Sequence, residues 1–304
     1  MDIREHTLMM KITRLNDDYR LIGAVRGIAV YLDTFAIIRM AQESQQRRDR
    51  FLNCLSDGSA DLLFSVANSI DLVGSNKTVK AFLKQIANHW FPVDLSVNAV
   101  CKREEQGLMG ADAFTAMDFA QVVFAAQVQP YLASGGITHF SPDLFAPDKF
   151  IEWLELHKDR IWKDRNALDE TLFQKVKEYR SRQKLDASWV EDSFPEFARF
   201  RRDKPAMFAY ENIIRGFVMD RGTQPKKGDG LDLSHAVLGS AFANFAALDG
   251  QWKKRIESLP KPNGLARIYS EPELDQMVSD IERECKKIRM LRARGLLGET
   301  VFVG

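Results

Sequence analysis

Two short apolar runs near the start of the chain each predict a buried β-strand. The first is IAVYL at residues 28–32, and the second is ADLLFSV at residues 60–66. Apolar residues at helical spacing follow both runs, over residues 34–55 and through NSIDLVG. Strand and helix signals that alternate in this way predict a parallel sheet with helices on both faces.

Residues 75–228 show a different pattern. Apolar residues recur at helical intervals in KTVKAFLKQIANHW, DAFTAMDFAQVVFAAQ, FIEWLELHKDRIW and TLFQKVKEYRSRQ, and no β-rich run stands out between them. We interpret this region as a mainly helical insertion or subdomain. Its core is expected to contain four tryptophans, Trp90, Trp153, Trp162 and Trp189.

The alternating pattern returns after residue 228. LDLSHAVLGSAFAN (231–244) predicts a helix, FAAL (245–248) a short strand, QWKKRIESL a helix and GLARIYS (264–270) another strand. A last helix is predicted in EPELDQMVSDIERECKKIRML, which begins acidic and ends basic as the helix dipole favours. Residues 1–74 and 229–304 are therefore expected to form one discontinuous, three-layer α/β/α domain, interrupted by the insertion at 75–228.

Composition places the chain among soluble globular proteins. It has 304 residues, of which 45% are hydrophobic and 28% charged, and its formal net charge is +1. A near-neutral balance excludes bulk electrostatic attraction to nucleic acid, so such binding would need a local basic patch. The cysteines, Cys54, Cys101 and Cys285, form no CxxC pair and predict reduced thiols. No signal peptide or membrane span is recognisable, which predicts a cytoplasmic protein without a membrane partner.

Aspartates follow the predicted strands in a repeated way. Asp33 and Asp249 come directly after the strands at 28–32 and 245–248. Asp71 lies on the helix after the second strand, and Asp232 opens the helix at 231–244. Each one alone is readily explained as a helix cap or a solvated acid. Because ligands of open α/β sheets bind at the carboxyl ends of the strands, the four together predict an acidic site at that edge.

The same segments resemble a known family. LDTF, SVANSIDLVG, GDGLDLSHAVLGSAFANFAALDGQWKKRI and LARIYS look, in that order, like the motifs of PIN-like domain nucleases. The resemblance covers about residues 27–74 and 229–282 and implies an α/β/α fold with a central parallel sheet. It also implies that the catalytic and metal-binding acids are Asp33, Asp71, Asp232 and Asp249.

Three positions depart from the family pattern. Phe35 stands where members commonly carry Asn, and Ala247 stands where a Ser or Thr is frequent. The second acid is often Glu, which reaches further than Asp71. Groups that support metal ligands strengthen such sites, so these departures favour a second interpretation, a catalytically weakened module that binds nucleic acid or protein.

A cluster of carboxylates has the chemistry of a magnesium or manganese site, because these hard ions prefer oxygen ligands. Such ions activate water for attack on phosphate. The expected activity is therefore Mg²⁺- or Mn²⁺-dependent hydrolysis of RNA, with single-stranded RNA as the expected substrate. The resemblance further implies an inhibitor protein of the antitoxin type and a homodimer as candidate partners.

Other residues are weaker candidates for the site. His235 lies one helical turn after Asp232 and is placed to touch substrate, although a helix histidine is more often structural. Four lysines flank Asp232 and Asp249 and are candidates for contacts with substrate phosphates: Lys226, Lys227, Lys253 and Lys254. The stretch FARFRRDKPAMFAY (197–210) mixes aromatic and basic residues and fits either base stacking or a packed helix.

Several enzyme classes lack their motifs here. No GxxxxGK[ST], GxGxxG or GxSxG motif occurs, which argues against a P-loop protein, a dinucleotide-binding protein and an α/β hydrolase. A phosphomonoesterase on a similar sheet stays an alternative, but in the DxD type of phosphatase the general acid stands at the position of Phe35.

Overall fold

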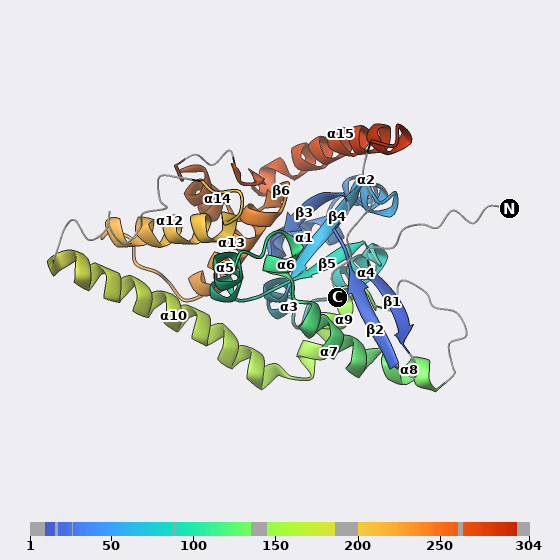
Figure 1. Ribbon diagram of the computed structural model, residues 1–304, viewed down its shortest axis with the longest axis horizontal. Helices are drawn as coiled ribbons and strands as arrows, with labels where there is room; N and C mark the ends of the chain where they lie inside the picture. The colour runs from blue at the N-terminus through green and yellow to red at the C-terminus, as the bar shows by residue number, and fades with distance from the viewer. Residues whose placement is uncertain are drawn as a thin grey trace.

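The computed structural model describes most of the chain. The described residues are 10–15, 18–25, 27–87, 89–134, 145–185, 200–260 and 264–296. Within them the protein is an α/β structure with a five-stranded parallel sheet between layers of helices (Figure 1). This confirms the three-layer α/β/α fold that the sequence predicts.

The central sheet has the strand order β5-β4-β3-β6-β7, and every pairing in it is parallel. The strands are β3 (Ile28–Leu32), β4 (Ala60–Ser65), β5 (Trp90–Val93), β6 (Phe245–Ala247) and β7 (Arg267–Tyr269). Because all strands run the same way, their carboxyl ends share one edge. The middle strand β3 pairs with β4 on one side and with β6, from the far end of the chain, on the other.

The mainly apolar runs at residues 28–32 and 60–66 form the buried strands β3 and β4. All residues of β3 and β4 are buried, as expected for parallel strands covered on both faces. The predicted strands at 28–32, 60–66, 245–248 and 264–270 are thereby confirmed within a few residues at their ends.

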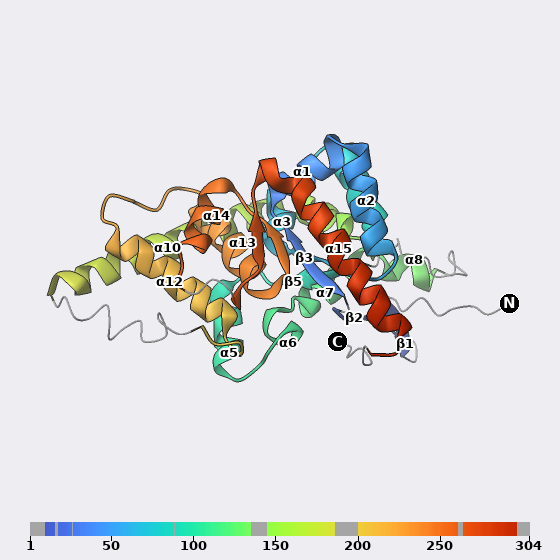
Figure 2. The same ribbon diagram turned by 90° about the horizontal axis from the view of Figure 1, so that it is seen from above.

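Helices cover both faces of the sheet (Figure 2). On one face lie α1 (Thr34–Gln42), α2 (Gln45–Ser56), α4 (Lys77–Ile86) and α15 (Leu274–Ala293), and α15 packs on α2, β3 and β6. On the other face lie α13 (Asp229–Phe242) and α14 (Gly250–Glu257), and α13 packs on β3 and β6. Right-handed parallel crossovers require this division, since the chain moves outward from β3 in opposite directions in its two halves. Short segments complete the layers, α3 (Val66–Asp71) and the 3₁₀ helix η4 (Glu271–Glu273).

The region expected to be mainly helical also contains a strand. The stretch Trp90–Val93, the sequence WFPV, forms the edge strand β5 of the main sheet, so the expectation that residues 75–228 contain no β-rich run is wrong at this stretch. Trp90 is fully buried and packs against Phe64, Phe145 and Phe150. It is a core residue, as expected, but of the sheet layer.

The helices between β5 and α13 form a large addition to the α/β core. They are α5 (Val97–Glu105), α6 (Ala111–Phe114), α7 (Met117–Gln127), α8 (Gln129–Ala133), α9 (Asp148–Glu155), α10 (Lys158–Leu185) and α12 (Pro205–Met219). Trp153, on α9, is partly buried and stacks on His157. The Trp162 side chain, Trp189 and residues 197–199 of the aromatic-basic stretch lie outside the described part; Phe200 and Phe208 pack against each other and the core.

An additional hairpin precedes the sheet. Strands β1 (Met10–Leu15) and β2 (Asp18–Gly23) pair antiparallel as a separate two-stranded sheet, which the sequence pattern did not predict. The hairpin is fastened to α7 by the Gln121 side chain, whose Oε1 accepts from the Leu21 N–H at 2.8 Å. Across the described residues, no helix combines the length and the apolar character needed to cross a membrane.

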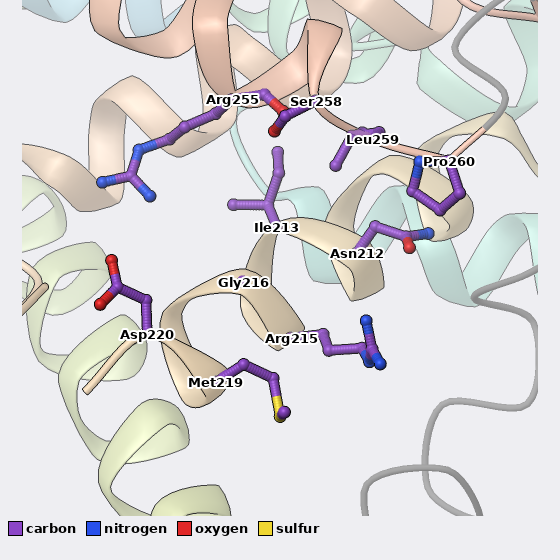
Figure 3. A pocket seen from close by; sticks show the side chains of 10 residues that line it. All are labelled: Asn212, Ile213, Arg215, Gly216, Met219, Asp220, Arg255, Ser258, Leu259 and Pro260. Carbon is purple, nitrogen blue, oxygen red and sulfur yellow. The ribbon is translucent and has the colours of Figure 1, made fainter. Parts of the chain in front are cut away.

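A cavity of about 320 Å³ lies between α12 and the end of α14 (Figure 3). Its lining comprises Asn212, Ile213, Arg215, Gly216, Met219, Asp220, Arg255, Ser258, Leu259 and Pro260. None of these is an acid predicted for the site, so the cavity and the acidic cluster are distinct features of the molecule.

Candidate active site at the carboxyl edge of the sheet

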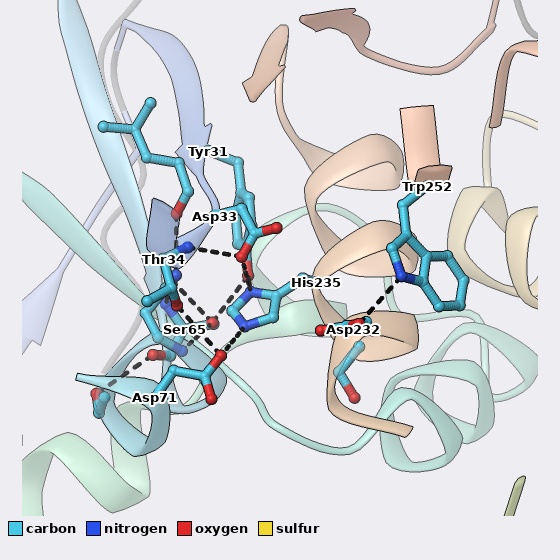
Figure 4. A network of polar contacts seen from close by, with 12 residues as sticks. Tyr31, Asp33, Thr34, Ser65, Asp71, Asp232, His235 and Trp252 are labelled. Atoms are coloured by element: carbon cyan, nitrogen blue, oxygen red, sulfur yellow. Dashed lines mark hydrogen bonds and ion pairs between the residues drawn. The ribbon is translucent and has the colours of Figure 1, made fainter. Parts of the chain in front are cut away.

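Three of the four predicted acids surround one histidine (Figure 4). Asp33 directly follows β3 and is the N-cap of α1, where its Oδ1 accepts from the Thr34 N–H at 2.6 Å. Asp71 is the last residue of α3, and Asp232 lies in the first turn of α13. The common neighbour of these aspartates is His235, on the next turn of α13.

His235 is 1% exposed and contacts two of the acids. Its Nδ1 lies 3.7 Å from Asp33 Oδ1, and its Nε2 lies 3.5 Å from Asp71 Oδ2. The second contact lacks hydrogen-bond geometry, and Nε2 has no hydrogen-bond partner in the described part of the chain. The site therefore holds a buried polar nitrogen that faces carboxylates without being satisfied by them.

A tyrosine on the central strand orients the histidine. The Tyr31 hydroxyl lies 2.6 Å from His235 Nδ1 and 2.9 Å from Ser65 Oγ, and all three side chains are buried. Room for the Tyr31 ring comes from Gly239 on α13, where a Cβ would stand 2.6 Å from the ring. Replacement of this glycine by any larger residue would push the ring away from the histidine.

Ser65 links the tyrosine to the start of α3. It is the N-cap of this helix, in a reciprocal capping box with Asn68. The Asn68 amide also donates to the Leu32 carbonyl at 2.9 Å. The network thus ties together β3, β4, α3 and α13. Asp33 directly follows β3, Asp71 ends α3 and Asp232 lies on α13.

Burial and mutual repulsion shift the charges of this cluster. Burial is the largest cause that raises the pKa of Asp33, and it raises the pKa of Asp232 to about 6. Burial acts the same way on Asp71, but contacts with His235, Arg165 and Thr34 outweigh it and lower its pKa. For His235, burial favours the neutral ring, yet the surrounding carboxylates outweigh burial and raise its pKa. The cluster therefore favours a positive charge at its centre.

Asp249 occupies a different place. Its carboxylate is exposed and caps α14, where Oδ1 accepts from the Gln251 N–H at 2.8 Å. Its backbone N–H donates to the Asp33 carboxylate. The fourth predicted acid thus adjoins the cluster through its main chain, while its side chain serves the helix start.

Besides Tyr31, Ser65 and Thr34, two more residues at the cluster were not predicted. The Trp252 indole Nε1 donates to Asp232 Oδ2 at 3.2 Å, and Arg165 Nη1 lies 3.5 Å from Asp71 Oδ1. Trp252 follows Asp249 by three residues, so a helix beginning at that acid could have suggested it. Arg165 belongs to α10, and nothing in the local sequence relates it to residue 71.

The predicted lysines are dispersed. Lys226, Lys227 and Lys254 are exposed. Lys253 is bound to its surroundings: its Nζ donates to the Ile268 carbonyl at 3.0 Å and pairs with Glu257 and Glu273. Lys253 therefore has a structural task on α14, and the other three are solvent-facing cations.

The donor set fits magnesium or manganese in its chemistry. Three carboxylates crowd together with raised pKa values at two of them, so a divalent cation would relieve their repulsion. Once a bound cation displaces the ring proton, Nε2 of His235 would add a nitrogen donor, which manganese accepts more readily than magnesium. No three His, Cys, Asp or Glu side chains of the described residues are already closed around a position for a metal ion.

The fold and the site together define an α/β/α protein with a buried acidic cluster at the carboxyl edge of its parallel sheet. Comparisons with protein-family models, with curated proteins and with solved structures find no match to the chain.

Proposed function

We propose that the protein is a Mg²⁺- or Mn²⁺-dependent phosphodiesterase that cleaves RNA. The observation that carries this proposal is the convergence of Asp33, Asp71 and Asp232 around the buried His235. The order of the parallel strands and the position of these acids also support the resemblance to PIN-like nucleases. A bound divalent ion would supply activated water and neutralise charge on the phosphate.

The protein groups have separable roles in this proposal. Asp33, Asp71 and Asp232 would hold the cation, and Trp252 would keep the Asp232 carboxylate in place by its indole hydrogen bond. Tyr31 would fix the ring plane of His235, so that Nε2 faces the cluster. A carboxylate site held by such partners keeps its shape without the cation, which lowers the reorganisation needed for binding.

Cleavage of labelled single-stranded RNA in Mn²⁺, with and without a chelator, tests the proposal. Asp33→Asn and Asp232→Asn should each reduce cleavage at least 100-fold while the far-UV circular dichroism stays unchanged. The matched control is Asp229→Asn, on the same turn of α13, which should cleave normally because, among the described residues, its carboxylate accepts from the Lys226 N–H and contacts none of the clustered acids. Wild-type cleavage that survives the chelator, or full activity of Asp232→Asn, would contradict the proposal.

A second candidate function is a non-catalytic module that binds nucleic acid or protein. The observation that favours it is His235 itself, which already places a favoured positive charge among the acids. Ala247, fully buried in β6, also offers no hydroxyl to the cluster. This function predicts RNA binding without cleavage and no change in the unfolding temperature on addition of Mn²⁺.

A further inference from the structure

The long helix α10 is fixed to the start of the site helix α13. Asp169, on α10, is 6% exposed, and its Oδ2 accepts from the Gly228 N–H at 2.9 Å. Its Oδ1 accepts from the Gly230 N–H at 2.9 Å. The backbones touch here, because a Cβ at Gly230 would stand 2.5 Å from the carbonyl carbon of Leu168. The register of α10 against the site is therefore set tightly.

This register directs one arginine to the acidic cluster. Arg165 precedes Asp169 by four residues, and residues four apart lie on the same face of a helix. Its Nη1 lies 3.5 Å from Asp71 Oδ1, and the arginine side chain is 32% exposed. The guanidinium thus lies on the open side of the cluster, whereas His235 is enclosed.

The contact with Asp71 leaves part of the Arg165 side chain exposed to solvent. A charge-assisted hydrogen bond between guanidinium and carboxylate has a length of about 2.7–2.9 Å, so 3.5 Å is an ion pair without a full hydrogen bond. A guanidinium carries several donors in a planar fork that matches a phosphate. Among the cations of the described residues, Arg165 and His235 form the ion-pair contacts with Asp33 and Asp71.

We propose that Arg165 contacts a backbone phosphate of the RNA strand and positions that strand over the acidic cluster. This inference rests on the proposed nuclease function. The helical addition then supplies a substrate-binding residue, and Asp169 acts as a positioning residue that sets where Arg165 stands. A structural role limited to neutralising Asp71 is the alternative, and it predicts no dependence of RNA affinity on Arg165.

The test measures the binding of a fluorescent single-stranded RNA by anisotropy, on an Asp232→Asn background with chelator, where no cleavage is expected. Arg165→Ala should weaken binding roughly tenfold, and the slope of log affinity against log salt should shrink by about 0.7, the value for one phosphate contact to a single strand. Arg165→Lys should restore part of the affinity, because a cation returns without the planar fork. Thermal unfolding of each variant checks that the fold is kept.

The matched control is Lys177→Ala, which removes a cation from an exposed position three turns further along α10. It should leave affinity and salt slope unchanged. Equal affinity and equal slope for Arg165→Ala and its parent would overturn the inference, as would an Arg165→Ala loss that Lys177→Ala matches.

Cleavage in Mn²⁺ separates this inference from the proposed function. If wild-type protein cleaves RNA and Arg165→Ala cleaves with the same KM, the nuclease function stands and the role of Arg165 is wrong. If RNA binding depends on Arg165 but wild-type protein does not cleave, the phosphate contact stands and the nuclease function is wrong.

Discussion

The Tyr31 hydroxyl lies 2.6 Å from Nδ1 of His235, across the junction between the central strand β3 and α13, the helix that carries Asp232. Tyr31→Phe would keep the ring but leave His235 and Ser65 each with one buried partner fewer. The free energy of unfolding should fall by about 1–3 kcal/mol, the usual consequence of an unsatisfied buried group. Urea denaturation measures this. Tyr131→Phe, at a position that is 66% exposed, serves as the control and should change stability by less than about 0.5 kcal/mol.

Trp252 offers a way to disturb Asp232 without touching it. Trp252→Phe removes the indole N–H that binds Asp232 and keeps an aromatic ring against Phe217. Mn²⁺ affinity, measured by titration calorimetry, should fall by about 10–100-fold, because partners of metal ligands have effects of this size. Trp153→Phe, in the stack with His157, should bind Mn²⁺ like the wild type. If Trp252→Phe and Trp153→Phe bind Mn²⁺ with equal affinity, the indole hydrogen bond to Asp232 does not support metal binding.

Two glycines should respond to alanine in opposite ways. At Gly230 the added methyl would meet the Leu168 backbone at 2.5 Å, so Gly230→Ala should destabilise the protein by about 1–3 kcal/mol. At Gly216, inside α12, the methyl would meet no described atom within 4 Å, so Gly216→Ala should stabilise it by up to about 1 kcal/mol. Thermal and urea unfolding of the pair measure the difference. A Gly230→Ala variant as stable as the wild type, or more so, would show that α10 and α13 are less tightly packed than the structure has them.

Glu104 makes stability depend on pH. Its carboxylate is 1% exposed and accepts from the N–H groups of Ala206 and Met207, at the start of α12. Burial raises the pKa of Glu104 to about 7. Because the folded protein then holds this proton more strongly than the unfolded chain, the stabilisation is complete below about pH 4.5 and is lost as pH rises through 7.

Glu104→Gln should remove this part of the pH profile. Between pH 5 and 7.5 the unfolding free energy of the wild type should lose on the order of 1–2 kcal/mol through this group. The variant should lack that decline, because an amide does not titrate in this range. The nearby Glu105→Gln serves as the control and should retain the wild-type slope. A parallel pair of profiles for wild type and Glu104→Gln would contradict the assignment.

The sequence predicted those strands of the sheet whose residues are mainly apolar. IAVYL is an unbroken apolar run, and ADLLFS is mostly apolar, with Asp61 and Ser65 as its polar residues. Burial on both faces makes such runs typical of parallel strands. WFPV was missed because it is short, contains proline and begins only four residues after the end of a strongly amphipathic helix. The proline is tolerated because β5 is an edge strand. A local pattern cannot reveal whether a strand will lie at an edge.

The site was predictable where it depends on the carboxyl ends of the parallel strands lying at one edge of the sheet. Asp33 follows β3, Asp71 ends the short helix after β4, and Asp232 lies in the first turn of α13. All three therefore lie near the carboxyl ends of parallel strands, and this relation brought them together. Asp249 shares the position but uses its carboxylate as a cap. Arg165 lay beyond prediction, because its place depends on how two helices separated in the sequence pack, and only the structure contains that information.

The pairing of β3 with β6 has a consequence for folding during synthesis. The Ala29 N–H donates to the Asn244 side chain, 215 residues later in the chain, and Val30 stands opposite Phe245. During synthesis, β3 leaves the ribosome long before its neighbour β6. Contacts between residues so far apart in the sequence reduce the rate of folding. The acids at 33 and 71 meet the one at 232 only then. A nascent chain that ends before residue 232 would therefore carry two of the three clustered acids and lack the central histidine.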